Sequence, residues 1–345
     1  MIKKYSIAIT FLILTIALFW QFFFKGLYPF PGNLLLSWHE PWRSEYFIDG
    51  RITIPNKPVV DDAFKHIYPL RILSIDMFKK FELPLWNPYN GAGMPLLAGG
   101  NNGVLDPFNI LFLVLPYPLA WSIYVLLQPL LAGICMYLYC RKISLRPIAA
   151  LFASIAFMLS GFVTVKAIFS IYGLAIATLP LLLYLIESYL QNVITKRTYL
   201  IPFLLFVMIV SALPQVSLYI IILTYSYLLF RIALCHSERS EESPTTVGIR
   251  NGKRSFGRFR SLRMTTRQVL PVTLLFILGL GLSSLQLLPT LELFQHASVD
   301  TQGSSFIIEK FLVQSNTFYP SLSLTILAMK PYTITGDMQI TNKQL

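Results

Sequence analysis

The residues best suited to chemistry are two adjacent aspartates, Asp61 and Asp62, in a long polar stretch near the N-terminus. A carboxylate can take a proton from a hydroxyl group as a general base, and positive side chains can stabilise an anion. Lys65, His66 and Arg71 follow on the next turns of a predicted helix and could supply that charge. The structural alternative is that Asp61 or Asp62 caps the helix by accepting its free backbone N–H groups. The two roles are compatible.

A second group of candidates follows in the run LPLWNPYNGAGMPLLAGGNNG, which is dense in Pro, Gly and Asn. Such residues fix tight turns and let the backbone approach a ligand closely. Trp86 and Tyr89 could offer stacking surfaces for a sugar ring, or they could belong to an aromatic belt at a membrane interface. With Asn87 they are candidate substrate-binding residues.

An amphipathic helix must position the aspartates. Over residues 62–81 the apolar side chains recur at helical spacing on one face, at Phe64, Ile67, Leu70 and Ile75. Pro69 should kink this helix. An amphipathic helix beside a membrane commonly lies in the interface plane. Residues 107–116 are apolar but too short to cross a bilayer, so they predict a re-entrant or interfacial piece.

The composition places these elements in a membrane protein. Of the 345 residues, 55% are hydrophobic and 13% are charged, against about 25% charged in a soluble domain. The net charge of +12 would suggest nucleic acid in a soluble protein, but we attribute it to the basic cytoplasmic loops of a membrane protein and expect no nucleic-acid partner. The three cysteines show neither disulfide nor zinc spacing, and no nucleotide-binding loop or Ser-His-Asp arrangement is present.

Seven apolar stretches predict membrane spans, since about 20 residues cross the hydrocarbon core. They cover residues 5–24, 118–139, 147–165, 171–190, 200–213, 215–233 and 269–291. The first is predicted to be an uncleaved anchor, because it is long for a signal peptide and no cleavage site follows it. Pro214 separates two of the stretches, which could instead form one broken helix.

The loop charges favour seven spans. With Lys3 and Lys4 in the cytoplasm, the cytoplasmic loops 140–146, 191–199 and 234–268 are basic and the short outside loops are nearly free of charge, with Lys166 alone near one of them. A single span over 200–233 would put the most basic segment outside. We therefore expect an all-α polytopic protein of the bacterial cytoplasmic (inner) membrane with a cytoplasmic N-terminus.

The predicted parts are an anchor (1–26), a long extracytoplasmic loop with interfacial and re-entrant helices (27–117), spans two to six (118–234), a basic disordered insertion (235–268), the seventh span (269–291) and an extracytoplasmic remainder (292–345). The two arms of the insertion can be encoded by mutually reverse-complementary codons, from the pair Cys235/Thr265 to the pair Glu241/Phe259. Our hypothesis is that an inverted-repeat DNA element entered the gene and was translated; a gene sequence without a hairpin over these codons would contradict it.

Polar side chains inside the apolar stretches have a separate interpretation. Gln128, Glu187 and Gln286 are expected to form hydrogen bonds between helices. Gln215 follows Pro214 near the outer end of a span, and we expect it to face the same outside cavity as the first loop and to contact substrate there.

Several motifs carry a family resemblance. In the first loop they are DAFKHIYPLR (62–71), LPLWNPYNGAGMPLLA (83–98) and DPFNILF (106–112), followed in order by LSGF (159–162), LPLLLYLIE (179–187), ALPQVSLY (212–219) and LQLLPTLEL (285–293). On these motifs the chain resembles the bacterial YfhO-type membrane proteins over most of its length outside 235–268. The run PLWNPYNGAGMPLLA is the most specific. The sequence departs from the family pattern at His66, at Gly100–Gly103 and at Lys330.

The resemblance implies a fold and an activity. The family is similar to the GT-C glycosyltransferases, polytopic enzymes that move a sugar from a polyprenyl-phosphate carrier to an envelope acceptor on the outer face. By that implication Asp62 would be the general base, with Asp61 as the second candidate. The expected partners are the lipid bilayer, a lipid-linked sugar donor and an envelope polymer or lipid acceptor.

The family's chains are longer, which implies that this one is an N-terminal portion. The competing functions are a transporter or flippase of lipid-linked sugars and an inactive truncated membrane protein. We expect no cofactor; two adjacent aspartates are not a metal-ligand set, so metal dependence stays open.

Overall fold

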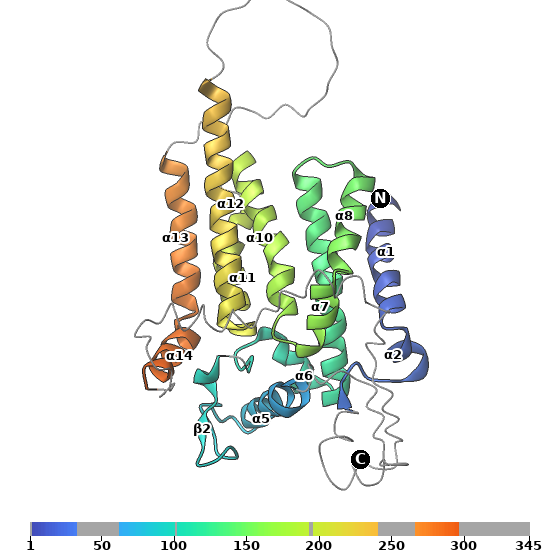
Figure 1. Cartoon of the computed structure of the whole chain (residues 1–345), viewed down its shortest axis with the longest axis vertical. Coiled ribbons are helices and arrows are strands. Elements are labelled where there is room, and N and C mark those ends of the chain that lie inside the picture. The colour runs from blue at the N-terminus through green and yellow to red at the C-terminus, as the bar shows by residue number, and fades with distance from the viewer. Residues whose placement is uncertain (1, 33–61, 101, 193–195, 241–265, 297–345) are drawn as a thin grey trace, which may run out of the picture.

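The computed structural model describes residues 2–32, 62–100, 102–192, 196–240 and 266–296. These residues form an all-α fold with one two-residue β-ladder. A bundle of roughly parallel and antiparallel helices makes up most of it (Figure 1). The bundle helices are α1 (Ile2–Leu18), α7 (Tyr117–Lys142), α8 (Pro147–Met158), α10 (Gly173–Asn192), α11 (Leu200–Ser211), α12 (Pro214–Ser240) and α13 (Thr266–Leu282).

Shorter elements gather at one end of the bundle, which we call the loop end because it carries α5, α6, β2 and α14 (Figure 1). In chain order they are α2 (Trp20–Lys25), the π-helix η3 (Ala63–Ile67), α5 (Tyr68–Lys79), β1 (Trp86–Asn87), β2 (Met94–Pro95), η4 (Leu97–Gly99), η5 (Pro107–Asn109), α6 (Ile110–Val114), α9 (Gly161–Lys166), η6 (Ala167–Phe169) and α14 (Ser284–His296). The opposite end, which we call the far end, carries the start of α1, the 3-10 helix η7 (Lys196–Tyr199) and the ends of α7, α10 and α12.

Helix length and hydropathy identify membrane-spanning candidates. In the described residues three helices are long and apolar enough to cross a bilayer, namely Tyr117–Lys142, Gly173–Gln191 and Pro214–Ile232. Two bent pairs raise the number to five if each is one span: α8 with residues 161–169, bent by 41°, and residues 269–282 with α14, bent by 65°. The chain is therefore an all-α, multi-pass membrane protein, as predicted.

The count of seven spans stays a prediction. All seven predicted stretches lie on helices. However, α11 has 12 residues, and a helix of that length rises only about 18 Å against a hydrocarbon core of about 30 Å. The apolar helix Ile7–Leu18 is short for the same reason.

The bundle topology agrees with the predicted alternation of loops. Pro214 begins α12 and does not interrupt a longer helix. The Ser217 hydroxyl donates to the Met208 carbonyl at 3.2 Å, so α12 packs beside α11. The alternative of one broken helix over 200–233 is therefore wrong. The ends of α7, α10 and α12 and the starts of α8, α11 and α13, which flank the loops predicted to be basic and cytoplasmic, all lie at the far end (Figure 1). Most of the predicted insertion, residues 241–265, lies outside the described residues.

The loop end is packed onto the bundle through an apolar core. Ile67 and Ile75 of the η3–α5 segment, Phe112 of α6 and Trp121 of α7 are almost completely buried in one cluster. Residues 63–79 are helical as predicted, with the expected apolar face inward. The helix changes from π to α geometry just before Pro69, which has no N–H for a regular helical hydrogen bond. Residues 107–114 are also helical, as predicted for the short apolar piece.

Candidate functional site

Asp62 stands immediately before η3 and is exposed. Its backbone is helical (φ −55°, ψ −33°), and its side chain makes no capping hydrogen bond. The capping alternative is therefore wrong for Asp62, because an N-cap needs an extended backbone that turns the side chain toward the free N–H groups. Asp61 lies outside the described residues. The Asp62 carboxylate remains available for another partner.

The structure brings together the segments that carry Asp62 and Lys166, a residue that the sequence did not single out as a site residue, because their chain neighbours Ala63 and Ala167 are buried in one apolar cluster. The Lys166 ammonium lies 4.9 Å from the ring centroids of both Phe169 and Tyr172. The bend of 41° after α8 carries Lys166 on α9. A lysine near an otherwise uncharged outside loop was the only sequence signal for this position.

Lys65 and His66 lie on η3, one turn after Asp62. Lys65 is exposed, and its ammonium lies 5.9 Å from the Phe64 ring centroid, while His66 is partly buried. These two residues therefore lie on the helical turn that follows Asp62, as the sequence predicted.

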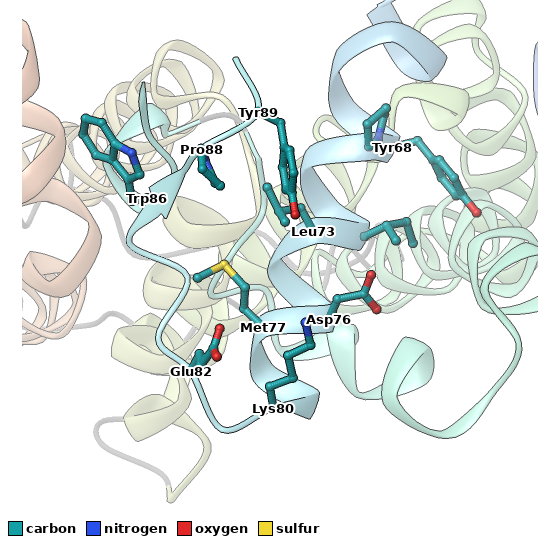
Figure 2. A pocket seen from close by; sticks show the side chains of 11 residues that line it. Tyr68, Leu73, Asp76, Met77, Lys80, Glu82, Trp86, Pro88 and Tyr89 are labelled. Carbon is teal, nitrogen blue, oxygen red and sulfur yellow. The ribbon is translucent and has the colours of Figure 1, made fainter. Parts of the chain in front are cut away.

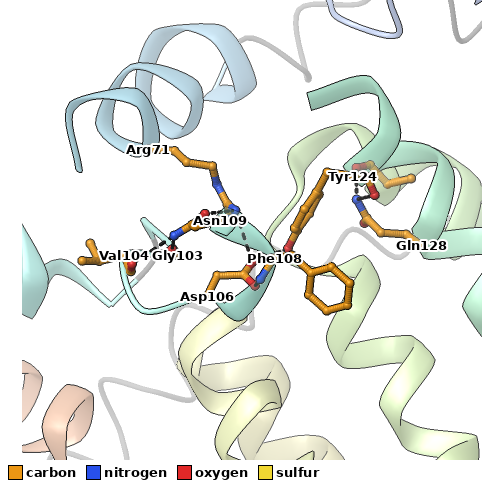
Figure 3. Close-up of polar contacts among 9 residues, drawn as sticks. Arg71, Gly103, Val104, Asp106, Phe108, Asn109, Tyr124 and Gln128 are labelled. Atoms are coloured by element: carbon orange, nitrogen blue, oxygen red, sulfur yellow. Dashed lines mark hydrogen bonds and ion pairs between the residues drawn. The ribbon is translucent and has the colours of Figure 1, made fainter. Parts of the chain in front are cut away.

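Arg71 has a different environment, shown in Figure 3. Its guanidinium is fully buried, and Nη1 donates to Asp106 Oδ2 at 3.2 Å and to Asn109 Oδ1 at 2.9 Å. The Tyr124 hydroxyl donates to the same Asp106 oxygen at 2.5 Å. The guanidinium carbon also lies 4.8 Å from the Tyr124 ring centroid. Arg71 therefore connects α5 to η5 and α7.

The rest of this network orders the loop before α6. Asp106 Oδ1 accepts from the Phe108 N–H at 2.9 Å and caps η5. Asn109 Nδ2 donates to the carbonyls of Gly103 and Val104. Gly103 has φ +60°, and a Cβ there would lie 2.3 Å from Arg71 Nη2. Only glycine fits this approach.

These contacts give Arg71 a structural role in place of the predicted substrate contact, because no part of its side chain is exposed. Burial disfavours the charged guanidinium, but the oxygens of Tyr124 and Asp106 outweigh this, and the pKa of Arg71 lies above its ordinary value. Arg71 therefore stays charged and holds the amphipathic helix on the bundle.

Trp86, Asn87 and Tyr89 belong to a short antiparallel hairpin, in which Trp86 pairs with Pro95 and Asn87 with Met94. Asn87 is 3% exposed, and its Oδ1 accepts from the Tyr89 N–H at 2.9 Å, so it shapes the turn. Trp86 and Tyr89 are 50% and 82% exposed. Their side chains remain available to a ligand.

A pocket of about 640 Å³ lies between α5 and this hairpin (Figure 2). Its polar and aromatic lining comes from Tyr68, Asp76, Lys80, Glu82, Trp86 and Tyr89. The sequence predicted two of these residues. It missed the others because their approach depends on how the hairpin folds back over α5.

The polar residues of the predicted spans form hydrogen bonds within the protein. Gln128 donates to the Ala167 carbonyl at 3.0 Å, Gln286 donates to the Leu97 carbonyl at 2.5 Å, and Glu187 accepts from Arg231. Each connects separate elements, as predicted. Gln215 instead donates to Tyr219 of its own helix at 2.9 Å, and no described contact joins it to Asp62.

No cluster of three or more His, Cys, Asp or Glu side chains that could hold a metal ion occurs among the described residues.

The fold and this loop end define a class: a polytopic helical membrane protein with amphipathic helices and a pocketed hairpin at one end of the bundle. The model of the family described as "Bacterial membrane protein YfhO" matches residues 87–326. The chain belongs to this family, and the predicted resemblance is confirmed. The match begins at the second residue of β1 and includes β2 and the helices from α6 to α14, whereas Asp62, α5 and Trp86 precede it. No curated protein and no solved structure matches the chain.

Proposed function

We propose that this protein is a membrane glycosyltransferase that moves a sugar from a polyprenyl-phosphate carrier to an envelope acceptor at the outer face. The observation that carries the proposal is the exposed Asp62 carboxylate, which caps no helix and directly precedes a segment that packs against the one carrying Lys166, since Ala63 and Ala167 share one buried cluster. A base beside a cation, at the end of a helical membrane bundle, suits a donor whose reacting phosphate sits at the bilayer surface.

The chemistry needs one proton transfer and one displacement. The Asp62 carboxylate takes the proton of the acceptor hydroxyl as the oxygen attacks the anomeric carbon. The bond from that carbon to the phosphate oxygen breaks, and the carrier phosphate leaves with the electron pair. Lys166 stabilises the leaving phosphate, with Lys65 as a second cation one turn from Asp62. Lys166 is partly buried over two rings, so a low local dielectric strengthens its attraction for an anion.

The proposal fixes an orientation. The loop end faces the outside of the cytoplasmic (inner) membrane, and the far end, with the start of α1, faces the cytoplasm. Residues 27–117 then form the extracytoplasmic loop around the site. The basic segment 235–268 is an insertion on the cytoplasmic side, and residues 292–345 return to the outside.

The test is transfer of a labelled sugar from a polyprenyl-phosphate donor by the full chain in lipid nanodiscs, with an envelope extract as acceptor. Asp62→Asn should lower the rate by about 100-fold or more, the range for loss of a general base. Lys166→Met should lower it as well. Glu292→Gln, an exposed carboxylate also at the loop end, and Lys196→Met, an exposed lysine at the far end, are the matched controls. Unchanged transfer by Asp62→Asn would overturn the proposal.

A second candidate is a flippase of lipid-linked sugars, and the bent pairs at 41° and 65° favour it, since broken helices form many transport sites. Transport sites lie near the bilayer midplane, whereas α14 lies at the loop end (Figure 1). Movement of a labelled lipid-linked sugar across vesicles, unaffected by Asp62→Asn, would favour the flippase.

A further inference from the structure

The pocket between α5 and the hairpin has the composition of a ligand site. Its volume of about 640 Å³ lies within the range of roughly 300–1,000 Å³ that small-molecule sites occupy. Its apolar lining includes Ile72, Leu73 and Met77 of α5. Aromatic and charged side chains from α5, from the segment after it and from the hairpin line the pocket, and Tyr89 lies beside Leu73 between α5 and the hairpin (Figure 2).

Two aromatic rings provide exposed flat surfaces. Gly93 has φ +99°, and a Cβ there would lie 2.4 Å from Trp86 Nε1, so the indole packs directly on the Gly93 backbone. The ring is thereby fixed while half of the residue stays exposed. Tyr89 is 82% exposed and lines the same pocket. Rigid aromatic side chains supply large contact areas at low conformational cost.

The polar groups of the pocket are suited to hydroxyls. Asp76 Oδ1 accepts a short hydrogen bond from the Tyr117 hydroxyl, which also accepts from Lys79 Nζ at 3.0 Å. These bonds hold the Asp76 side chain in place. Ionised carboxylates are acceptors only, so Asp76 and Glu82 can receive hydrogen bonds from ligand hydroxyls.

The charge of the pocket argues against an anionic ligand. Asp76 and Glu82 contribute two negative charges and Lys80 one positive charge, which leaves a net charge of −1 at neutral pH. Like charges in a confined site repel, and this disfavours a polyphosphate chain. A neutral polyol meets no such penalty and matches both the stacking surfaces and the acceptors.

We propose that this pocket binds a neutral saccharide, and that it holds the acceptor glycan of the transfer reaction. The role of the bound saccharide as acceptor rests on the proposed function, whereas the binding of a saccharide in this pocket does not. Tyr68 lines the pocket and follows Asp62 by six residues in the same helical segment, which is roughly two turns. A glycan lying along α5 would therefore reach from the pocket toward Asp62. The donor phosphate would be held at Lys166, outside the pocket.

The test is saturation-transfer NMR of neutral hexose oligosaccharides of two to four units with the full chain in lipid nanodiscs, since a maltoside detergent would itself compete. Tyr89→Ala should weaken binding about twofold to twelvefold, because one stacking contact contributes roughly 0.5–1.5 kcal/mol beyond buried area. Glu82→Gln should weaken it by a smaller factor. The controls are Tyr199→Ala, an exposed tyrosine at the far end, and Glu292→Gln at the loop end.

Each result has a defined meaning. Tyr89 is too exposed for its loss to unfold the hairpin, so binding unchanged in both Tyr89→Ala and Glu82→Gln would overturn the proposal. Absence of saccharide binding, or equal binding of a glycerol-phosphate oligomer, would also overturn it. If oligosaccharides bind but Asp62→Asn transfers sugar normally, the pocket stands and the proposed function fails. If Asp62→Asn abolishes transfer but no oligosaccharide binds, the function stands and the pocket fails.

Discussion

Two buried ion pairs lie at opposite ends of the bundle and are built differently. At the loop end Arg71 reaches Asp106 through one nitrogen, and neither side chain is exposed. Toward the far end Glu187 receives two bonds from Arg231, at 3.1 and 2.8 Å, and further bonds from Tyr227 and Gln191. Arg231 is 20% exposed at its side chain.

The two ion pairs also differ in the elements that they join. The Glu187 pair joins α10 to α12, two helices that also share an apolar core. The Arg71 pair holds the α5 segment and the loop before α6 against α7, beside an apolar core of its own. Both of its side chains are fully buried, so neither charge could reach water if its partner were lost, whereas Arg231 could. In the described structure Arg71 Nε and Nη2 have no hydrogen-bond partner. Stacking of the guanidinium on the Tyr124 ring partly compensates for these missing hydrogen bonds. We infer that the loop end depends more strongly on its ion pair.

The largest effect is expected for Asp106→Ala. It leaves the Arg71 charge buried without a counterion and removes the cap of η5, so stability should fall by about 3–5 kcal/mol. The midpoint of thermal unfolding in nanodiscs measures this. Asp106→Asn, which keeps the shape and an acceptor, should be milder. A loss under about 1 kcal/mol for Asp106→Ala would show that the loop end does not depend on the pair.

Gly103→Ala should come next. It places a Cβ 2.3 Å from Arg71 Nη2 at a positive φ, and strained positions of this kind cost of order 1–3 kcal/mol. Gly26 also has a positive φ, but a Cβ there would meet no other atom. At Gly281 the φ is not positive and a Cβ would again meet no other atom. The order of unfolding midpoints should be Gly103→Ala lowest, then Gly26→Ala, then Gly281→Ala. Equal unfolding midpoints for Gly103→Ala and Gly26→Ala would mean that the contact with Arg71 adds nothing to the cost of a side chain at a positive φ.

Glu187→Gln should have a smaller effect than Asp106→Ala, of about 1–2 kcal/mol. The amide oxygen can still accept from Tyr227, and Arg231 is partly exposed and can reach water. The same unfolding measurement applies. A loss as large as that of Asp106→Ala would reverse the comparison between the two ends.

The smallest effect on stability is expected for Asp62→Asn. Its side chain is exposed and makes no capping bond, and surface changes away from such features rarely alter stability. The unfolding midpoint should equal that of the unmodified protein while sugar transfer is lost. A clear fall in the midpoint would mean that Asp62 supports the loop end and would weaken its assignment as a base.

The helical part of the fold was predictable because periodicity and hydropathy are local properties. The apolar face of residues 63–79 and the short helix before α7 follow from spacing alone. Arg71 was not predictable, since a charged residue on an amphipathic helix ordinarily faces solvent. Its burial depends on Asp106 and Tyr124, which lie 35 and 53 positions later in the chain.

The sequence by itself determined the membrane environment, the family and the places of the apolar helices, because each is set by composition, motif order or spacing. Only the tertiary structure decided that the segments of Asp62 and Lys166 pack together, that Arg71 is structural, and that Trp86 and Tyr89 share a pocket with Asp76 and Glu82. These are contacts between distant segments. They depend on helix bends and on glycines at positive φ, and the direction that the chain takes after such a position cannot be predicted from residue types alone.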